Sequence, residues 1–139
     1  MSAATSVPGK HAIRGYSHVN ILVTDLAAAR DFYIEKLGME VLPRPDFGGF
    51  AGEWYRTGDL QLHLSVVQEM PDLKGGFPHF ALYIPTEVFH DTIAALRESG
   101  VPFLGEAMER KDFGVPVLAA FCKDPDGNVV ELTDVGPLS

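Results

Sequence analysis

The chain repeats one order of elements, strand–helix–strand–strand–strand, twice within its 139 residues. In each half, a strand that contains a histidine precedes an amphipathic helix that ends at a glycine. His18 and Gly38 in the first half correspond to His79 and Gly100 in the second, at separations of 61 and 62 residues. A repeat of this length predicts one α+β domain built from two similar modules.

The positions of the elements follow from hydrophobic patterning. Alternating apolar residues predict strands, and apolar residues at helical spacing predict two helices, which begin near the capping residues Asp25 and Thr86. In module one, residues 16–67, we expect strands at 16–24, 39–42, 50–57 and 60–67. In module two, residues 77–134, we expect strands at 77–84, 102–108, 115–123 and 128–133.

Composition limits the function classes. The sequence is 46% hydrophobic and 22% charged, as in globular domains, and no apolar run is long enough to span a membrane. We expect a flexible N-terminal tail at 1–15, a single domain at 16–139 and a cytoplasmic location, because the first residues do not resemble a signal peptide. The net charge of −8 argues against nucleic acid or an anionic membrane as partner.

Glu131 is the first candidate functional residue. It lies in an apolar strand that follows the turn Asp124-Pro125-Asp126-Gly127. A carboxylate on a covered sheet face costs several kcal/mol unless it is paired, hydrogen-bonded or bound to a metal. Cys122 is the only cysteine, so a metal would have to be held by histidines and carboxylates.

Superposing the two modules supplies partners for this carboxylate. His18 pairs with His79 in the first strands, and His63 pairs with Glu131 in the fourth strands. If each module curls one sheet face inward, all four side chains can point into one cavity. A single histidine in a strand is more often a hydrogen-bonded sheet residue, but four ligand-type residues at equivalent positions favour a site for Zn, Ni, Fe(II), Mn or Co.

Other polar and aromatic residues admit two interpretations. Gln61, two residues before His63, either supports that histidine or lines the cavity. Trp54, Tyr55 and Phe121 either line an apolar pocket or pack in the core. The longer loops at 43–49 and 105–116 are either lids or packed turns.

Five segments carry a family resemblance: His18-Val-Asn-Ile-Leu-Val-Thr-Asp25, Phe32-Tyr33-Ile-Glu-Lys-Leu37-Gly38, Leu62-His63-Leu64, Pro78-His79-Phe80 and Asp124 through Leu132. Together they resemble the vicinal oxygen chelate superfamily, which includes glyoxalases, bleomycin-resistance proteins and extradiol dioxygenases. The resemblance implies paired βαβββ modules that form a curved mixed sheet around a metal-binding cavity, commonly in a homodimer, with the site inside one chain or shared between two.

The resemblance also implies a function. The metal ligands would be His18, His63, His79 and Glu131, and a divalent ion would chelate vicinal oxygens of a small-molecule substrate. Lyase, isomerase or dioxygenase chemistry is expected, with Glu131 also acting as a catalytic base. In extradiol dioxygenases a histidine near the position of His63 is instead an acid–base group, so His63 is a catalytic candidate too.

Leu22 bears on the choice among family members, and the ligand set bears on the alternative function. Glyoxalase I enzymes carry an arginine for glutathione four residues after the first ligand, and here that position is Leu22, which argues against glutathione. The alternative function is a metal-free protein that sequesters a small molecule, as bleomycin-resistance proteins do, although such members usually lack the ligand set.

Overall fold

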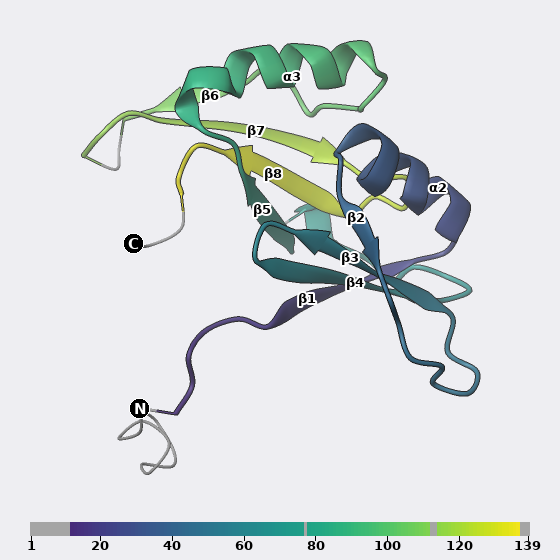
Figure 1. Ribbon diagram of the computed structural model, residues 1–139. Coiled ribbons are helices and arrows are strands. Elements are labelled where there is room, and N and C mark those ends of the chain that lie inside the picture. Colours follow the sequence, from purple (N-terminus) through teal and green to yellow (C-terminus); the bar gives the residue numbers. More distant parts are fainter. Residues whose placement is uncertain (1–11, 77, 112–113, 137–139) are drawn as a thin grey trace.

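Two four-stranded mixed sheets make up the computed structural model, which describes residues 12–76, 78–111 and 114–136 (Figure 1). The strand orders are β1-β4-β3-β2 and β5-β8-β7-β6. In each sheet the first strand of the module runs parallel to the fourth, and the other neighbours are antiparallel. The predicted pair of βαβββ modules is therefore confirmed. Most of the expected tail at 1–15 lies outside the described residues.

The observed elements agree closely with those predicted. Seven of the eight strands lie within two residues of their expected bounds. The first module contains β1 (His18–Val23), α2 (Leu26–Arg30), the π-helical turn η1 (Asp31–Lys36), β2 (Glu40–Leu42), β3 (Gly52–Thr57) and β4 (Leu60–Val66). The second contains β5 (His79–Tyr83), the 3₁₀ turn η3 (Thr86–Val88), α3 (Phe89–Glu98), β6 (Met108–Arg110), β7 (Val117–Lys123) and β8 (Val129–Thr133), and a 3₁₀ turn η2 (Lys74–Gly76) precedes β5.

The first helical segment changes from α to π geometry halfway along. Asp25 caps its start by accepting hydrogen bonds from the amides of Ala27 and Ala28, at 2.9 and 3.3 Å. Farther on, the amide of Leu37 donates to the carbonyl of Phe32, five residues earlier. The wider turn allows the adjacent rings of Phe32 and Tyr33 both to be buried. An α-helix would place adjacent side chains about 100° apart.

The expected strand at 102–108 is wrong. Only Met108–Arg110 forms a strand there, and Phe103 makes a single bridge to Cys122. Between them Gly105 adopts a φ of +86°, which turns the chain out of the extended conformation. The hydrophobic pattern of the segment was read as a strand, but the glycine interrupts it.

Thr86 also differs from its predicted role. Instead of capping α3, its hydroxyl donates a hydrogen bond of 2.8 Å to the carboxylate of Asp134. The 3₁₀ turn η3 then leads into α3, and Val88 at the helix start provides no side-chain cap. The hydroxyl thus connects the start of the helical segment to the end of β8.

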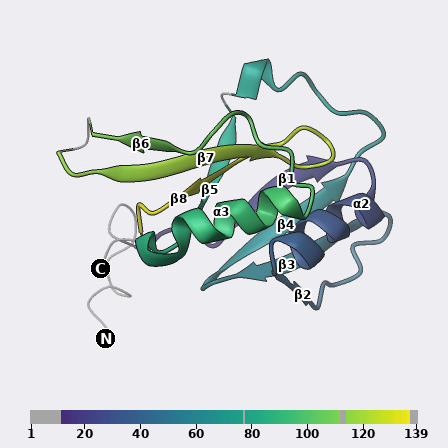
Figure 2. The ribbon, with the colours of Figure 1, turned by 90° about the horizontal axis from the view of Figure 1, so that it is seen from above.

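The two modules share one hydrophobic core. Both helical segments lie on the same side of the molecule (Figure 2), and their buried rings, including Phe32, Tyr33 and Phe89, belong to a single cluster with the inner faces of both sheets. Burying a large apolar side chain contributes about 1.5–3 kcal/mol. The modules are therefore expected to unfold together.

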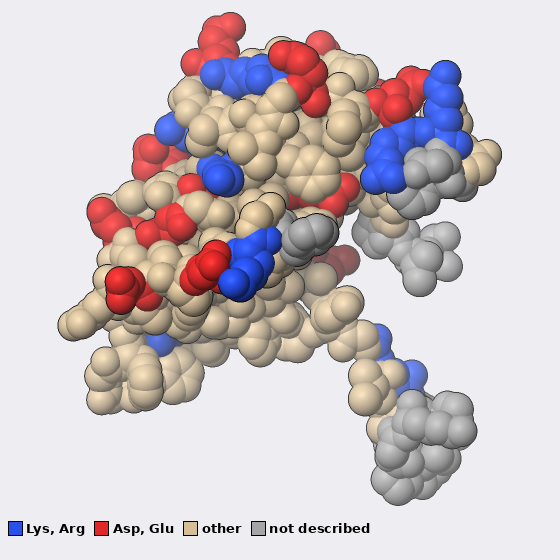
Figure 3. Space-filling model, turned by 180° about the vertical axis from the view of Figure 1, so that it is seen from behind, with Lys and Arg blue, Asp and Glu red and all other residues tan. Residues whose placement is uncertain are grey.

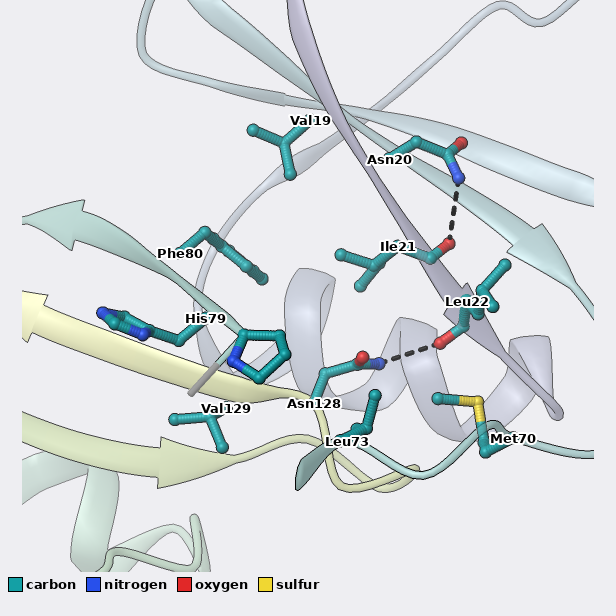
Figure 4. A pocket seen from close by; sticks show the side chains of 11 residues that line it. Val19, Asn20, Ile21, Leu22, Met70, Leu73, His79, Phe80, Asn128 and Val129 are labelled. Carbon is teal, nitrogen blue, oxygen red and sulfur yellow. Dashed lines mark hydrogen bonds between the residues drawn. The ribbon is translucent and has the colours of Figure 1, made fainter. Parts of the chain in front are cut away.

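The turn between β7 and β8 joins the second module to the first. Asp124 is 3% exposed and accepts hydrogen bonds from the phenol of Tyr33, the backbone amides of Asp126 and Asn128, and the side-chain amide of Asn128. Asn128 also donates to the carbonyl of Leu22 on β1 at 2.8 Å, as Figure 4 shows. These bonds satisfy the buried carboxylate and hold the modules in one arrangement.

Charged side chains are interspersed on the surface. On the face in Figure 3, acidic and basic groups are mixed, and no broad basic area like that of a nucleic-acid-binding protein is visible there. Among residues 12–76, 78–111 and 114–136, every helix is too short or too polar to cross a bilayer.

Candidate functional site

The first pair of candidate ligands lies on the outer face of the first sheet. In the parallel pairing of β1 with β4, Asn20 is opposite His63 and His18 is opposite Gln61. Because residues two apart point to the same face, His18 and His63 are diagonal neighbours. Their rings stack, with centroids 3.9 Å apart and planes inclined by 17°.

His63 is enclosed on several sides. It is 9% exposed, its Nε2 lies 2.8 Å from Oε1 of Gln61, and its ring stacks on Trp54 at 4.2 Å. Burial lowers the pKa of His63 below its usual value, and the nearby His18 and Arg44 lower it further. The imidazole is thereby kept neutral, which is the form that binds metals.

The second pair lies on the outer face of the second sheet. Nε2 of His79 on β5 is 3.2 Å from Oε1 of Glu131 on β8, and the side chains are 38% and 21% exposed. Phe121 lies beside them, with its ring centroid 5.9 Å from that of His79. Glu131, whose position in an apolar strand required a partner, therefore finds it in His79.

The two pairs are equivalent in strand register. His79 is opposite Val129, two residues before Glu131, just as His18 is opposite Gln61, two residues before His63. Each module thus presents one candidate ligand from its first strand and one from its fourth, at the same diagonal offset.

The four residues do not meet within one chain. Among the described residues, no group of three or more His, Cys, Asp or Glu side chains is placed to hold a metal ion. Each pair offers two donors, whereas protein zinc sites are usually four-coordinate and other divalent ions take up to six ligands. Imidazoles with one carboxylate suit a transition metal, so the donor types fit, and we call each pair a candidate half-site.

The aromatic residues left open by the sequence take different roles. Tyr55 belongs to the core and is fully buried, whereas its neighbour Trp54 lies opposite His63 on the outer face. Period-two alternation requires this division, since adjacent residues on a strand face opposite sides. Arg44, whose charge acts on His63, was not recognised from sequence because it lies in the irregular loop after β2.

Cavities adjoin both half-sites. One of about 270 Å³ lies between β1 and β5 and includes His79, Asn128 and the side chains of Met70 and Leu73 (Figure 4). Another, of about 360 Å³, lies beside His63 and is lined in part by the loop after β2. A small ligand therefore has space next to either pair.

Comparison with known proteins identifies the family. A family model described as "Glyoxalase/Bleomycin resistance protein/Dioxygenase superfamily" matches residues 15–132, which include all four candidate ligands. The chain belongs to this superfamily. The resemblance inferred from the sequence motifs is thereby confirmed.

Two relatives of this chain have names that describe enzymes. "Lactoylglutathione lyase GLX1" of Arabidopsis thaliana is 31% identical over 132 residues, which are 89% of this chain and 45% of the plant protein. The chain thus spans about half the length of that relative. "Probable lactoylglutathione lyase" of Synechocystis is 32% identical over 123 residues, which cover 83% of this chain and 91% of the cyanobacterial protein.

A solved structure supports the superfamily fold. The fosfomycin resistance protein FosX from Listeria monocytogenes superposes with a TM-score of 0.74, covering 91% of this chain and 94% of FosX. At 19% sequence identity, this likeness applies to the fold alone.

Proposed function

We propose that the protein is a divalent-metal-dependent enzyme whose site is shared by two copies of the chain. His18 and His63 of one copy and His79 and Glu131 of the other would hold the ion. The observation that carries the proposal is the register: each module presents an equivalent pair of donors on an outer face, and the two pairs stay apart within one chain.

A symmetric dimer would complete both sites at once. With a two-fold axis, module one of each copy faces module two of the other, so two equivalent sites of four donors form. Neither half-site alone supplies enough ligands for tight binding. A homodimer is therefore part of the proposal and not an independent addition.

The side chains have distinct roles in this site. The bound ion would act as a Lewis acid on vicinal oxygens of the substrate. His18 and His63 would hold the ion through their imidazole nitrogens, and Gln61 would keep the ring of His63 in place. Glu131 doubles as the base that takes a proton from the substrate, since its carboxylate lies beside His79 and is partly exposed.

Lyase or isomerase chemistry on a small oxygen-chelating metabolite is the reaction class that we favour. Two relatives carry the name lactoylglutathione lyase, although this chain spans about half of the plant protein. Leu22 occupies the position at which glyoxalase I enzymes carry an arginine for glutathione, so we do not extend glutathione to this chain. Dioxygenase chemistry, with His63 as an acid–base group, is the second candidate.

Subunit mixing tests the shared site. Two variants are prepared, His18→Ala with His63→Ala and His79→Ala with Glu131→Gln, and each is expected to bind no metal by itself. In a mixed dimer one site combines the two intact halves. Co-expression in equal amounts should restore about a quarter of the wild-type metal content, because about half of the dimers are mixed and each has one intact site.

The alternatives give different outcomes. If one chain formed a complete site, mixing would restore nothing, although the wild type would bind metal. If the protein is a metal-free binding module, the wild type itself would show no metal above background after purification without chelator, and no thermal shift with Ni, Zn, Mn or Fe(II). Either result would reject the shared metal site.

A further inference from the structure

The cavity of about 360 Å³ beside His63 has a character that the metal site does not explain. Its wall is aromatic on several sides, formed by Phe47 and Phe50 of the loop after β2, by Trp54 of β3 and by His63 itself. Asn20 and Ser65 add polar edges, and one cation, Arg44, lies in the lining. We call this cavity the Trp54 pocket.

Flat rings continue from the candidate ligands into this pocket. The imidazole of His18 stacks on that of His63, which stacks in turn on the indole of Trp54 with planes only 6° apart. Phe47 follows with its centroid 6.0 Å from that of Trp54. A planar group in the pocket would therefore meet aromatic surface directly beside the proposed metal position.

Part of this aromatic surface faces solvent. Phe47 is 49% exposed and Phe50 is 77% exposed, although both are large apolar side chains. Exposed apolar surface gathered around a concave site is typical of a ligand-binding region. Covering it would release water from both rings.

Arg44 carries a charge that no carboxylate neutralises among the described residues. Its guanidinium donates one hydrogen bond, from Nη2 to the carbonyl of Phe50 at 3.0 Å, and lies 4.9 Å from the ring centroid of Phe47. Its Nε is buried and has no hydrogen-bond acceptor. The chain has 19 acidic and 11 basic residues, so acidic partners are abundant, yet Arg44 has none among the described residues.

The guanidinium is also held in position. The backbone of Gly52 lies close to the guanidinium. A Cβ added at Gly52 would lie 3.2 Å from Nη2 of Arg44 and 2.1 Å from the carbonyl oxygen of Leu64. Arg44 and His63 both line this pocket, so the charge lies in the same cavity as one candidate ligand. A fixed arginine fork pairs best with a carboxylate, which can accept two parallel hydrogen bonds.

We infer that the Trp54 pocket binds the aromatic ring of a substrate that also carries a carboxylate, and that Arg44 pairs with this carboxylate. The ring would lie on Trp54 and Phe47, next to His63, while the chelating oxygens of the same molecule extend toward the metal. This inference rests on the proposed function in calling the ligand a substrate and in placing its chelating oxygens beside the metal, whereas the binding of the ring and carboxylate in the pocket does not depend on it. It narrows the substrate to the class of aryl carboxylates.

Trp54 is the only tryptophan in the sequence, so its fluorescence reports on ligand binding in the Trp54 pocket. Benzoate is titrated into chelator-treated protein while the indole is excited at the red edge of its absorption band. Benzamide, which has the ring without the charge, and cyclohexanecarboxylate, which has the charge without the aromatic ring, serve as comparison probes. We expect a saturable change with benzoate and affinities at least about tenfold weaker for both comparison probes.

Arginine variants provide the matched control. Arg44→Gln should weaken benzoate binding at least about tenfold, and Arg44→Lys should weaken it less, because lysine keeps the charge but loses the fork. Arg97→Gln is the control, since Arg97 also lies over a phenylalanine ring, that of Phe103, and donates to a backbone carbonyl, that of Gly105. Arg97→Gln should leave benzoate affinity unchanged, and urea midpoints confirm that the variants are folded.

The outcomes separate this inference from the proposed function. Equal affinities for benzoate and benzamide, no saturable signal, or an equal loss in Arg97→Gln would overturn the aryl carboxylate assignment even if metal binds. Arg44-dependent benzoate binding by a protein that binds no metal would support the pocket and reject the metal-dependent enzyme.

Discussion

The phenol of Tyr33 donates a hydrogen bond of 2.8 Å to the carboxylate of Asp124, 91 residues farther along the chain. Both residues are almost completely buried, at 0% and 3% exposure. The bond runs from the π-helical turn of module one to the β7–β8 turn of module two, so it connects the modules through polar atoms inside the core. Burial and the neighbouring Asp124 both raise the pKa of Tyr33, which therefore stays protonated and able to donate.

Removing this hydroxyl should weaken the junction between the modules. We expect Tyr33→Phe to lower the free energy of unfolding by about 1–2 kcal/mol, since Asp124 retains its other donors. Urea denaturation at one fixed protein concentration measures the change. Tyr16→Phe is the control, because Tyr16 is 84% exposed and should change stability by less than about 0.5 kcal/mol. Equal stability of Tyr33→Phe and the wild type would show that the bond contributes nothing net.

Loss of one candidate ligand from the second half-site should weaken metal binding without unfolding the protein. His79→Ala removes a donor beside Glu131, and a site left with three donors is expected to lose at least about tenfold in affinity. Metal content by mass spectrometry and circular dichroism together report binding and fold. His90→Ala is the matched control, since His90 is exposed on α3 and contacts only Phe89 among the described rings. Full metal content in His79→Ala would exclude His79 as a ligand.

Gln61 should affect metal affinity through His63. Its side-chain oxygen lies 2.8 Å from Nε2 of His63, so Gln61→Leu would leave the ring without this partner while keeping a similar volume. Groups that orient a ligand typically contribute 10–100-fold to metal affinity, and we expect a loss in this range. Competition with a coloured chelator measures it. Unchanged affinity would mean that Gln61 only lines the cavity.

Cys122 should be unreactive in the folded protein. It is fully buried. Burial, as the main cause, and the nearby Asp124, as the second, raise the pKa of its thiol to about 12. A thiol reagent at pH 8 should label the protein in urea but not under native conditions. Rapid labelling of the native state would contradict the packing of β7.

The same thiol makes stability depend on alkaline pH. Because the pKa of the Cys122 thiol in the folded protein lies above its ordinary value of about 9, the contribution of the neutral thiol to stability is fully present below about pH 9 and is lost as the pH rises toward 12. Between pH 8 and pH 10, the wild type should therefore lose more stability than Cys122→Ala. A parallel decline in the two proteins would assign the alkaline loss to other groups.

Much of the architecture could be predicted because local patterning determines it. The repeat, the helix ends at Gly38 and Gly100 and the cap at Asp25 all follow from short-range rules. The expected strand at 102–108 was wrong because Gly105, a residue compatible with several conformations, adopts a left-handed φ there. A single-residue backbone choice of this kind is decided by the surrounding structure and not by propensity.

The sequence predicts the members of the candidate site, and the structure shows how these residues are arranged. The sequence by itself predicted four donor residues as two equivalent pairs, His18 with His79 and His63 with Glu131, because the modules repeat and side chains alternate along each strand. Only the tertiary structure paired β1 with β4 and β5 with β8, which brings His18 beside His63 and His79 beside Glu131 but does not gather the two pairs into one site within the described chain. The buried hydrogen bonds of Asp124 and Asn128 connect the modules through their inner sides, and this long-range packing leaves the ligand pairs apart on the outer faces.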